Sequence, residues 1–361
     1  MIKYTYTFYE GDAVRIFEKF SRFISVVLIL SLCACGICSC ESTQKKPHQL
    51  IIEEKFNTTS VIYDYSGGTR SRFYEVCGEL SELLDYYHEL FDIYNTYEGV
   101  ANLAYVNSMA GKGAVKVDSE LVDFLEFSKE THTLTNGYVN IAMGAVLSIW
   151  HDCREAAEKN PSAARVPSEA ELAEAAKHCN IDDLVIDKEN MTVELLDPEM
   201  SLDVGAIGKG YATERIAEHL ASIGVSSYAL DIGGNLRVVG TKPDGSGWRA
   251  AVENPLVSNG TAIYKFEISD SSAVTSGRQK RFYTVDGVDY HHIISKDTLY
   301  PARYFASVTV LCRDSGYADA LSTAMFCMDY DTGRAFAQTL DGVEIIWVFD
   351  DGRVEKLLKS K

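Results

Sequence analysis

The stretch "SSYALDIGGNLRVVG", residues 226–240, decides the fold class. Two short runs of β-branched, aromatic and other apolar residues stand on either side of the glycine pair Gly233 and Gly234. A glycine pair between two such runs is typical of a hairpin. The sequence therefore predicts that a strand is followed directly by an antiparallel neighbour, with no helix between them.

The same pattern recurs through the second half of the chain, in "TVELL", "WRAAVE", "AIYKFEIS", "RFYTV", "YHHII", "ASVTVLC" and "EIIWVF". The first half has helical periodicity in residues 78–95, and Asp118 and Ser168 stand where N-caps would begin two further helices. No linker interrupts residues 51–355. We therefore expect an α+β fold, a single domain at 51–361 with a largely antiparallel mixed sheet and flanking helices.

Composition and charge exclude some functions. The chain has 361 residues, 46% of them hydrophobic, and a formal net charge of −18. So acidic a protein is not expected to bind nucleic acid through its phosphate backbone. A phosphorylated ligand would need another source of positive charge, and a divalent cation is the obvious candidate.

Residues 1–40 have the pattern of a targeting segment. Arg15, Lys19 and Arg22 precede the apolar run "FISVVLILSLCAC". This run is shorter than the roughly 20 apolar residues that a membrane-spanning helix needs. The polar stretch 41–50 that follows is expected to be a tether.

The end of this segment is rich in cysteine and allows three interpretations. "LCAC" and "ICSC" each resemble the lipobox of a bacterial lipoprotein, with Cys35, or alternatively Cys40, as the lipidated residue. A soft-metal site and an uncleaved membrane anchor are the alternatives, although a metal cluster here would lack a folded scaffold. We expect a chain that is lipid-anchored at the extracytoplasmic face of the bacterial cell membrane.

The segment "SGYADALSTAMF", residues 315–326, carries oxygen ligands in an apolar setting. In a helix, the spacing of Asp319 and Thr323 places both side chains on one face, with Ser322 beside them. Together they would form part of the shell of a hard cation such as Mg²⁺. Alternatively, Asp319 favours the start of the helix and Thr323 bonds back to a carbonyl.

Two further segments could contact a ligand. In "SLDVGAIGKGYATERIAEHL" a strand ends at Asp203, and glycines and Lys209 lead into a helix, which suits either a phosphate or a plain tight connection. The stretch "SSAVTSGRQKRF" predicts a loop at Ser276. In "GVDYHHII", His291 and His292 point to opposite faces of a strand, so at most one can face a given pocket, as a base or as a structural residue.

In their order along the chain, "DVGAIGKGYA", "DIGGN", "TSG" followed by "HHII", and "ADALSTAMF" resemble the ApbE-like flavin transferases, enzymes that move FMN from FAD onto a protein hydroxyl. Upstream, "TNGYVNIAMGAVLSIW" and "LAYVN" resemble further motifs of that family. The resemblance covers roughly residues 55–350. It implies an ApbE-like fold.

The resemblance also implies roles for individual residues. It places Mg²⁺ on Asp319, Thr323 and the backbone carbonyl of Ala206, with Ser322 nearby. It places FAD, as substrate, against Tyr138, Val139, Asn140, Asp203, Lys209 and Ile293. His292 aligns with the family histidine of H-I-I-D-P and is the implied catalytic base.

The chain departs from the family pattern at several positions. Asn140 stands where Asp is usual, and Ala145 stands where Pro is usual. Ser295 and Lys296 replace the Asp-Pro that commonly follows the His-Ile-Ile run. Contacts to the flavin end and the local loop shape are expected to differ accordingly.

The implied activity is Mg²⁺-dependent transfer of FMN from FAD onto a Ser or Thr hydroxyl of an acceptor protein, with release of AMP. The implied acceptors carry an FMN-binding domain, as in redox-pump subunits or extracytoplasmic flavoprotein reductases. One alternative is a Mg²⁺-dependent FAD pyrophosphatase that releases FMN and AMP. Another is a non-catalytic FAD-binding lipoprotein.

Overall fold

The computed structural model describes residues 47–257 and 260–358. The chain divides into two units, residues 1–40 and residues 41–361, and every described residue belongs to the second. The predicted targeting segment, with Cys35 and Cys40, lies outside the described residues. Among the described helices, none has the length and apolar character required to cross a bilayer.

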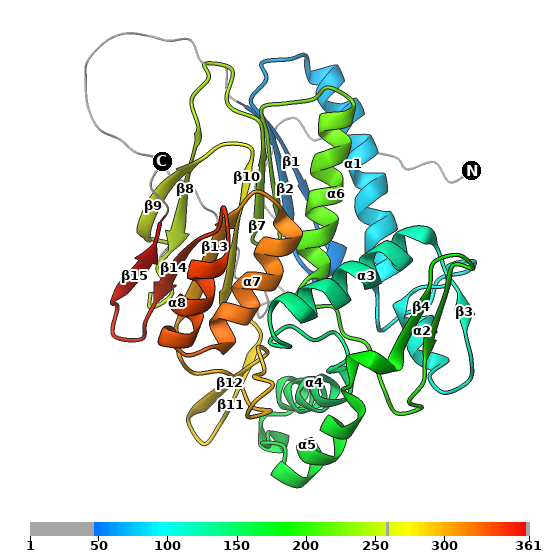
Figure 1. The fold of residues 1–361 in the computed structure, drawn as a ribbon. Coiled ribbons are helices and arrows are strands. Elements are labelled where there is room, and N and C mark those ends of the chain that lie inside the picture. Colours follow the sequence, from blue (N-terminus) through cyan, green and yellow to red (C-terminus); the bar gives the residue numbers. More distant parts are fainter. Residues whose placement is uncertain (1–46, 258–259, 359–361) are drawn as a thin grey trace, which may run out of the picture. The chain divides into compact units, whose positions relative to one another are not determined.

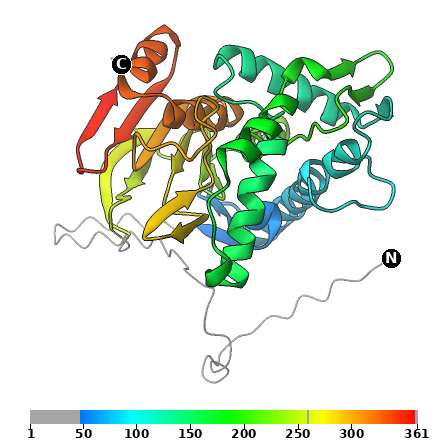
Figure 2. The same ribbon diagram turned by 90° about the horizontal axis from the view of Figure 1, so that it is seen from below.

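The main element is an eight-stranded sheet. Its strands are β1 (His48–Ile52), β2 (Ser60–Asp64), β6 (Tyr228–Ile232), β7 (Asn235–Val239), β10 (Ser271–Gly277), β13 (Ser307–Cys312), β14 (Glu344–Val348) and β15 (Val354–Leu357). They lie in the order β1-β2-β6-β7-β10-β13-β14-β15, and every neighbouring pair is antiparallel. Figure 2 shows the blue N-terminal and red C-terminal strands at opposite ends of this sheet.

Strands β6 and β7 form the hairpin that the opening sequence predicts. Ile232 pairs with Asn235 across a two-residue turn, and Gly233 and Gly234 have φ values of 61° and 94°. Two positive φ angles are the geometry of a hairpin turn whose twist matches that of the strands. A Cβ on Gly233 would also lie 2.6 Å from Cγ2 of Thr58, so this position needs glycine for space as well.

Three smaller sheets surround the main one. They contain β3 (Val115–Lys116), β4 (Leu184–Asp187) and β5 (Thr192–Leu195); β8 (Trp248–Glu253) and β9 (Ala262–Ile268); and β11 (Phe282–Val285) and β12 (Val288–His291). The helices of the described chain are α1 (Arg70–Phe91), α2 (Leu103–Ser108), α3 (Ser119–Leu134), α4 (Gly144–Lys159), α5 (Glu169–Ala175), α6 (Gly208–Ser222), α7 (Ser315–Cys327) and α8 (Tyr330–Thr339), with short 3₁₀ turns at Lys55–Asn57, Pro161–Ala163, Ala176–His178 and Ile181–Asp183.

The two faces of the main sheet are covered differently. Alternate residues of a strand point to opposite faces, so Val239 and Val274 pack on the helix side while Val238 and Ala273 pack against the β8–β9 hairpin. Helices α6 and α7 lie side by side on the helix face (Figure 1). This arrangement confirms the predicted α+β class with its largely antiparallel sheet and flanking helices.

Two of the helix starts predicted from capping residues are confirmed. The Asp118 side chain accepts the Glu120 N–H at the start of α3. At the start of α5, Ser168 and Glu171 form the reciprocal capping box. Each cap satisfies backbone donors that the first helical turn leaves free.

Two local differences from the sequence-based expectations concern strands. Strand β1 begins at His48, inside the stretch 41–50 that is predicted as a tether, and the His48 ring stacks on Phe73 with its centroid 5.3 Å away. The loop predicted at Ser276 is wrong, because Ser276 and Gly277 end strand β10, a central strand between β7 and β13. Pairing with β13 over residues 272–277, and with β7 over residues 271–274, overrides the weak strand propensity of "SSAVTSG".

Candidate active site

Helix α7 carries the predicted metal ligands. It begins at Ser315, and its N-cap is Asp314, whose side chain accepts the Tyr317 N–H at 3.0 Å. Asp319 lies in the second turn and is only 5% exposed. The interpretation that Asp319 favours the helix start is therefore wrong, because Asp314 has that role.

The Asp319 carboxylate is buried, and its neighbours offset only part of the cost of burying its charge. Its Oδ2 accepts the backbone N–H of Gly210 at 2.8 Å and lies 3.7 Å from Nζ of Lys209. Burial raises the pKa of Asp319, and Lys209 and the Gly210 N–H only partly oppose that effect. Among the described residues, no group donates a hydrogen bond to Oδ1. A buried anion with a free oxygen is a ready ligand for a cation.

Three hydroxyl groups lie together on the same side of α7. The Ser276 hydroxyl is 2.9 Å from that of Ser322 and 3.2 Å from that of Thr323. Ser322 also donates to the carbonyl of Asp319 at 3.0 Å. In the described structure Thr323 makes no bond back to a helix carbonyl, so the second half of the capping interpretation is also wrong.

The turn before α6 supplies another oxygen. Asp203 Oδ1 accepts the Gly205 N–H at 2.8 Å, and Lys209 Nζ lies 3.3 Å from the Gly205 carbonyl. Because Gly210 gives its N–H to Asp319, the carbonyl of Ala206 accepts no hydrogen bond from the described chain. Burial also raises the pKa of Asp203, against the lowering effect of the Gly205 N–H.

These oxygens fit a hard cation. Carboxylate, hydroxyl and backbone carbonyl oxygens are the ligands that Mg²⁺ takes, usually few in number and completed by water or substrate phosphate. The described chain holds no group of three His, Cys, Asp or Glu side chains that could bind a metal ion. A metal here would therefore rely on Asp319 and neutral oxygens.

The two adjacent histidines have different surroundings. His291 donates from Nε2 to the Ala302 carbonyl at 2.7 Å and accepts the Ile293 N–H at Nδ1 at 3.2 Å, so both nitrogens are used structurally. Nδ1 of His292 is buried and has no hydrogen-bond partner among the described residues. Burial, with the charge of Arg281, lowers the pKa of His292 to about 3. His292 is therefore neutral at pH 7 and is the histidine of the pair left free for chemistry.

The residues predicted to contact the flavin end lie on the segment 138–141 and beside the histidines. Val139 is buried. The side-chain amide of Asn140 donates from its nitrogen to the Cys179 carbonyl and accepts the Ala142 N–H at its oxygen. The Tyr138 hydroxyl donates to Asp297 at 3.0 Å. Burial, together with Asp297, raises the pKa of Tyr138 to about 12.

Backbone contacts join these segments. The Asp203 N–H donates to the Ile141 carbonyl at 2.8 Å, which ties the Tyr138 segment to the turn that holds Lys209. Ile293 is buried, and its carbonyl accepts the Ala302 N–H. Lys209, Asp319, Ser322 and Thr323 thus form one bonded group, to which Asp203 and Ala206 belong through their turn. Within the described part of the chain, no hydrogen bond or ion pair joins Tyr138, Val139 or Asn140 directly to Asp319.

Sequence reasoning missed Gly210 and the bonding role of Ser276. The "GKG" pattern indicates that the backbone comes close to another group. In the structure that group is helix α7, since a Cβ on Gly210 would lie 2.3 Å from the Ser315 carbonyl. The motif "TSG" contains Ser276, but only the folded chain places its hydroxyl beside that of Ser322. No local signal identifies Arg281 as a cation near His292.

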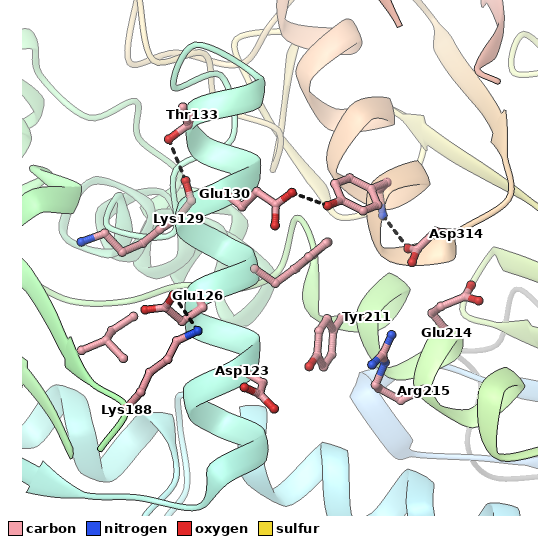
Figure 3. Close-up of a pocket in the computed structure, with 13 residues that line it drawn as sticks. Asp123, Glu126, Lys129, Glu130, Thr133, Lys188, Tyr211, Glu214, Arg215 and Asp314 are labelled. Carbon is pink, nitrogen blue, oxygen red and sulfur yellow. Dashed lines mark hydrogen bonds and ion pairs between the residues drawn. The ribbon is translucent and has the colours of Figure 1, made fainter. Parts of the chain in front are cut away.

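A separate hollow of about 700 Å³ lies between α3, α6 and α7 (Figure 3). None of its lining residues is a predicted site residue. Its charges are largely paired, with Lys188 at 3.1 Å from Glu126 and Tyr317 bonded to Glu130. A smaller hollow of about 400 Å³ lies beside Gly137 and Cys179. We place the candidate site at Asp319, where unpaired oxygens converge.

Replacing Gly210 by Ala is expected to destabilise the protein. Helix propensity alone would favour Ala by roughly 0.5–1 kcal/mol, but overpacking against the Ser315 carbonyl costs about 1–3 kcal/mol. Gly78, in the middle of α1, is the matched control because a Cβ there meets no atom within 4 Å. Denaturant unfolding should show Gly210→Ala less stable and Gly78→Ala more stable than the parent. Equal gains in both variants would contradict the close approach of α6 to α7.

The chain is similar to known proteins over most of its length. A family model described as the ApbE family matches residues 59–347. A protein from Treponema pallidum (strain Nichols) named FAD:protein FMN transferase is 28% identical over 340 residues, 90% of this chain and 91% of that protein. One with the same name from Vibrio cholerae serotype O1 is 29% identical over 261 residues, 72% and 75% of the two chains.

Solved structures show the same fold. The crystal structure of the ApbE protein from Thermotoga maritima superposes with a TM-score of 0.75 at 27% identity, covering 86% of this chain and 97% of that one. A mutant of the flavin transferase ApbE from Vibrio cholerae superposes with a TM-score of 0.67 at 26% identity, with coverages of 86% and 97%.

Proposed function

The chain belongs to the ApbE family and is a flavin transferase, and we propose that it moves FMN from FAD onto a Ser or Thr hydroxyl of an acceptor protein in a Mg²⁺-dependent reaction that releases AMP. The observation that carries the proposal is the grouping of Asp319, Ser322 and Thr323 beside Lys209, whose charge also acts on His292.

The metal would be held by Asp319, Thr323 and the Ala206 carbonyl, with Ser322 nearby. Bound there, Mg²⁺ would neutralise the FAD pyrophosphate and the charge that develops on the AMP leaving group. Lys209 supports this assignment, because its ammonium group lies 3.7 Å from Asp319 and adds positive charge at the same point. In a chain with a net charge of −18, these local cations offset repulsion of the substrate.

His292 is proposed as the base. The acceptor hydroxyl gives its proton to the neutral imidazole while its oxygen bonds to the FMN phosphorus, and the bond from that phosphorus to the AMP oxygen breaks in line. The cations around His292 support a neutral imidazole before reaction, since Arg281 and Lys209 both lower its pKa. Holding the acceptor loop beside the flavin supplies the proximity effect.

The flavin end of FAD is proposed to lie along Tyr138, Val139, Asn140, Asp203 and Ile293. The Asp203–Ile141 backbone bond supports this placement, because it holds the segment next to the Lys209 turn. The side-chain amide of Asn140 already bonds within the protein, so it would shape the pocket through its backbone.

The acceptors are proposed to be proteins with an FMN-binding domain, such as redox-pump subunits or extracytoplasmic flavoprotein reductases. The lipobox-like "LCAC" and "ICSC" support a lipid anchor on Cys35, or alternatively on Cys40, at the extracytoplasmic face of the cell membrane. The stretch "SGGT" at 66–69 has Gly where an acceptor motif has Ala, which supports action on a separate protein.

Release of AMP tests the proposal against the pyrophosphatase alternative. With FAD, MgCl₂ and an FMN-domain acceptor, AMP should appear in step with covalent flavin, and EDTA should stop both. The flavin pool is measured by chromatography, with the acceptor's target hydroxyl removed as the control. AMP and free FMN released equally fast without acceptor would identify a pyrophosphatase. Release that persists in EDTA would exclude the metal.

A further inference from the structure

Helices α6 and α7 are joined by two hydrogen bonds that form a ladder. The Gly210 N–H of α6 donates to Asp319 of α7 at 2.8 Å, and the Ser315 N–H of α7 donates to Oε2 of Glu214 of α6 at 2.7 Å. Within each helix the two bonded residues are one turn apart, so they share a face. The pairing is crossed in sequence order, which makes the two helices antiparallel at this contact.

The carboxylate of Glu214 is held from the sheet side as well. Arg237 of β7 donates to it twice, from Nε to Oε2 at 3.0 Å and from Nη2 to Oε1 at 3.2 Å. Glu214 is 5% exposed and Arg237 is 4% exposed. Arg237 also bonds Asp270 and the Val238 carbonyl, so its guanidinium is fixed independently of the helices.

Other charges near Glu214 do not replace this partner. Figure 3 shows Glu214, Arg215 and Asp314 along one wall of the hollow between the helices. Arg215 directs its guanidinium to Glu218, at 2.8 Å, and lies over the Tyr211 ring. Asp314 caps α7 through the Tyr317 N–H. Arg237 is therefore the cation that orients Glu214 toward Ser315.

We propose that Glu214, oriented by Arg237, is a positioning residue that fixes α7 against α6 and so sets Asp319 for the metal. This inference rests on the proposed function, in which Asp319 is a metal ligand. The first N–H groups of a helix have no partner inside it, and a carboxylate at that end is favoured by the helix dipole. Glu214 thus accepts the otherwise free N–H of Ser315, one helical turn before Asp319. Because the helical turn between Ser315 and Asp319 is rigid, a displacement of Ser315 also displaces Asp319.

In this proposal the Glu214–Arg237 ion pair affects metal affinity, whereas an ordinary buried ion pair affects only the stability of the fold. Residues that orient a metal ligand without touching the metal typically change metal affinity or activity by roughly 10-fold to 100-fold when replaced. A pair that only stabilised the fold would change the unfolding midpoint and leave metal affinity as it was. The two roles are separated by measuring metal binding on folded protein.

The test uses the purified full chain saturated with FAD and titrated with MgCl₂ by calorimetry. Glu214→Gln keeps the length of the side chain but removes its charge. Glu214→Asp keeps the charge but is too short to reach both Arg237 and Ser315. Glu218→Gln, one turn further along α6 and paired with Arg215, is the matched control. FAD binding without MgCl₂ and thermal unfolding are recorded for each variant.

Both Glu214 variants should bind Mg²⁺ roughly 10-fold to 100-fold more weakly than the parent. FAD binding without metal should be unchanged, and Glu218→Gln should match the parent. Unchanged Mg²⁺ affinity in a folded Glu214 variant would overturn the inference, as would failure of both variants to fold, since the pair would then serve the fold alone. A parent chain that binds no Mg²⁺ would instead contradict the proposed metal site.

Discussion

Replacing Asp319 by Asn is expected to reduce FMN transfer by roughly 100-fold to 1,000-fold or more, the range seen when one preorganised electrostatic group is lost from an active site. Asn has the same shape, and its amide oxygen can still accept the Gly210 N–H that Asp319 accepts at 2.8 Å. It lacks the charge that would hold a divalent cation. The rate is measured from the fluorescence of covalent flavin on the acceptor.

The fold should survive this substitution. Burial raises the pKa of Asp319, so its charged form is costly in the folded protein, and removing the charge should not lower the unfolding midpoint. Asp331, exposed in the first turn of α8, is the control, and Asp331→Asn should transfer FMN at the parent rate. Full activity in Asp319→Asn would remove Asp319 from the metal site.

Replacing His292 by Ala is expected to lower the transfer rate by about 100-fold to 10,000-fold, the usual contribution of a positioned base. FAD binding should be retained, because Nδ1 of His292 bonds to no other group of the described protein. The pKa of about 3 keeps the imidazole neutral throughout the pH range near neutrality.

Binding and chemistry are measured separately for this variant, by quenching of FAD fluorescence and by covalent flavin formation. His219, at the last turn of α6 and paired with Glu79, is the control histidine. His219→Ala should behave as the parent in both measurements. Equal losses of FAD binding and transfer in His292→Ala would reassign His292 to substrate binding.

The contrast between His291 and His292 shows how far sequence reasoning reaches. Alternation along a strand predicts that only one of the two can face a pocket, but β12 ends at His291 and His292 lies just beyond it. The alternation cannot say which one, because that depends on Ala302 and Ile293, whose backbone groups occupy both nitrogens of His291. The family resemblance selects His292, and its Nδ1, which has no hydrogen-bond partner in the described part of the chain, supports the same choice.

Helix α7 shows the same limit. Helical spacing predicts that Asp319 and Thr323 share a face, but it leaves open whether Asp319 is a cap, since the helix start cannot be fixed from "SGYADALSTAMF" alone. The structure resolves this through Asp314, one residue before the quoted segment. The contacts of Asp319 with Gly210 and of Ser322 with Ser276 join residues far apart in sequence, and no local pattern specifies them.

Dense apolar runs predict strands such as β13 and β14. The segment "SSAVTSG" of β10 has no such run, and its sequence does not predict a strand. Its residues Ser276 and Gly277 have low strand propensity, yet they continue the pairing of β10 with β13, opposite Val308 and Ser307. The sequence likewise does not predict the ion pair of Glu214 and Arg237, because these two residues meet only when β7 packs against α6. The sequence thus predicts the fold class, whereas the contacts that position the candidate site residues follow only from the structure.

The intact mass of an acceptor protein tests the proposed function most directly. The full chain is incubated with FAD, MgCl₂ and an acceptor that carries an FMN-binding domain. The acceptor should gain the mass of one FMN less one water, at a single Ser or Thr, with one AMP released for each flavin attached. An acceptor of unchanged mass, while FAD is converted to free FMN and AMP, would contradict the transfer reaction.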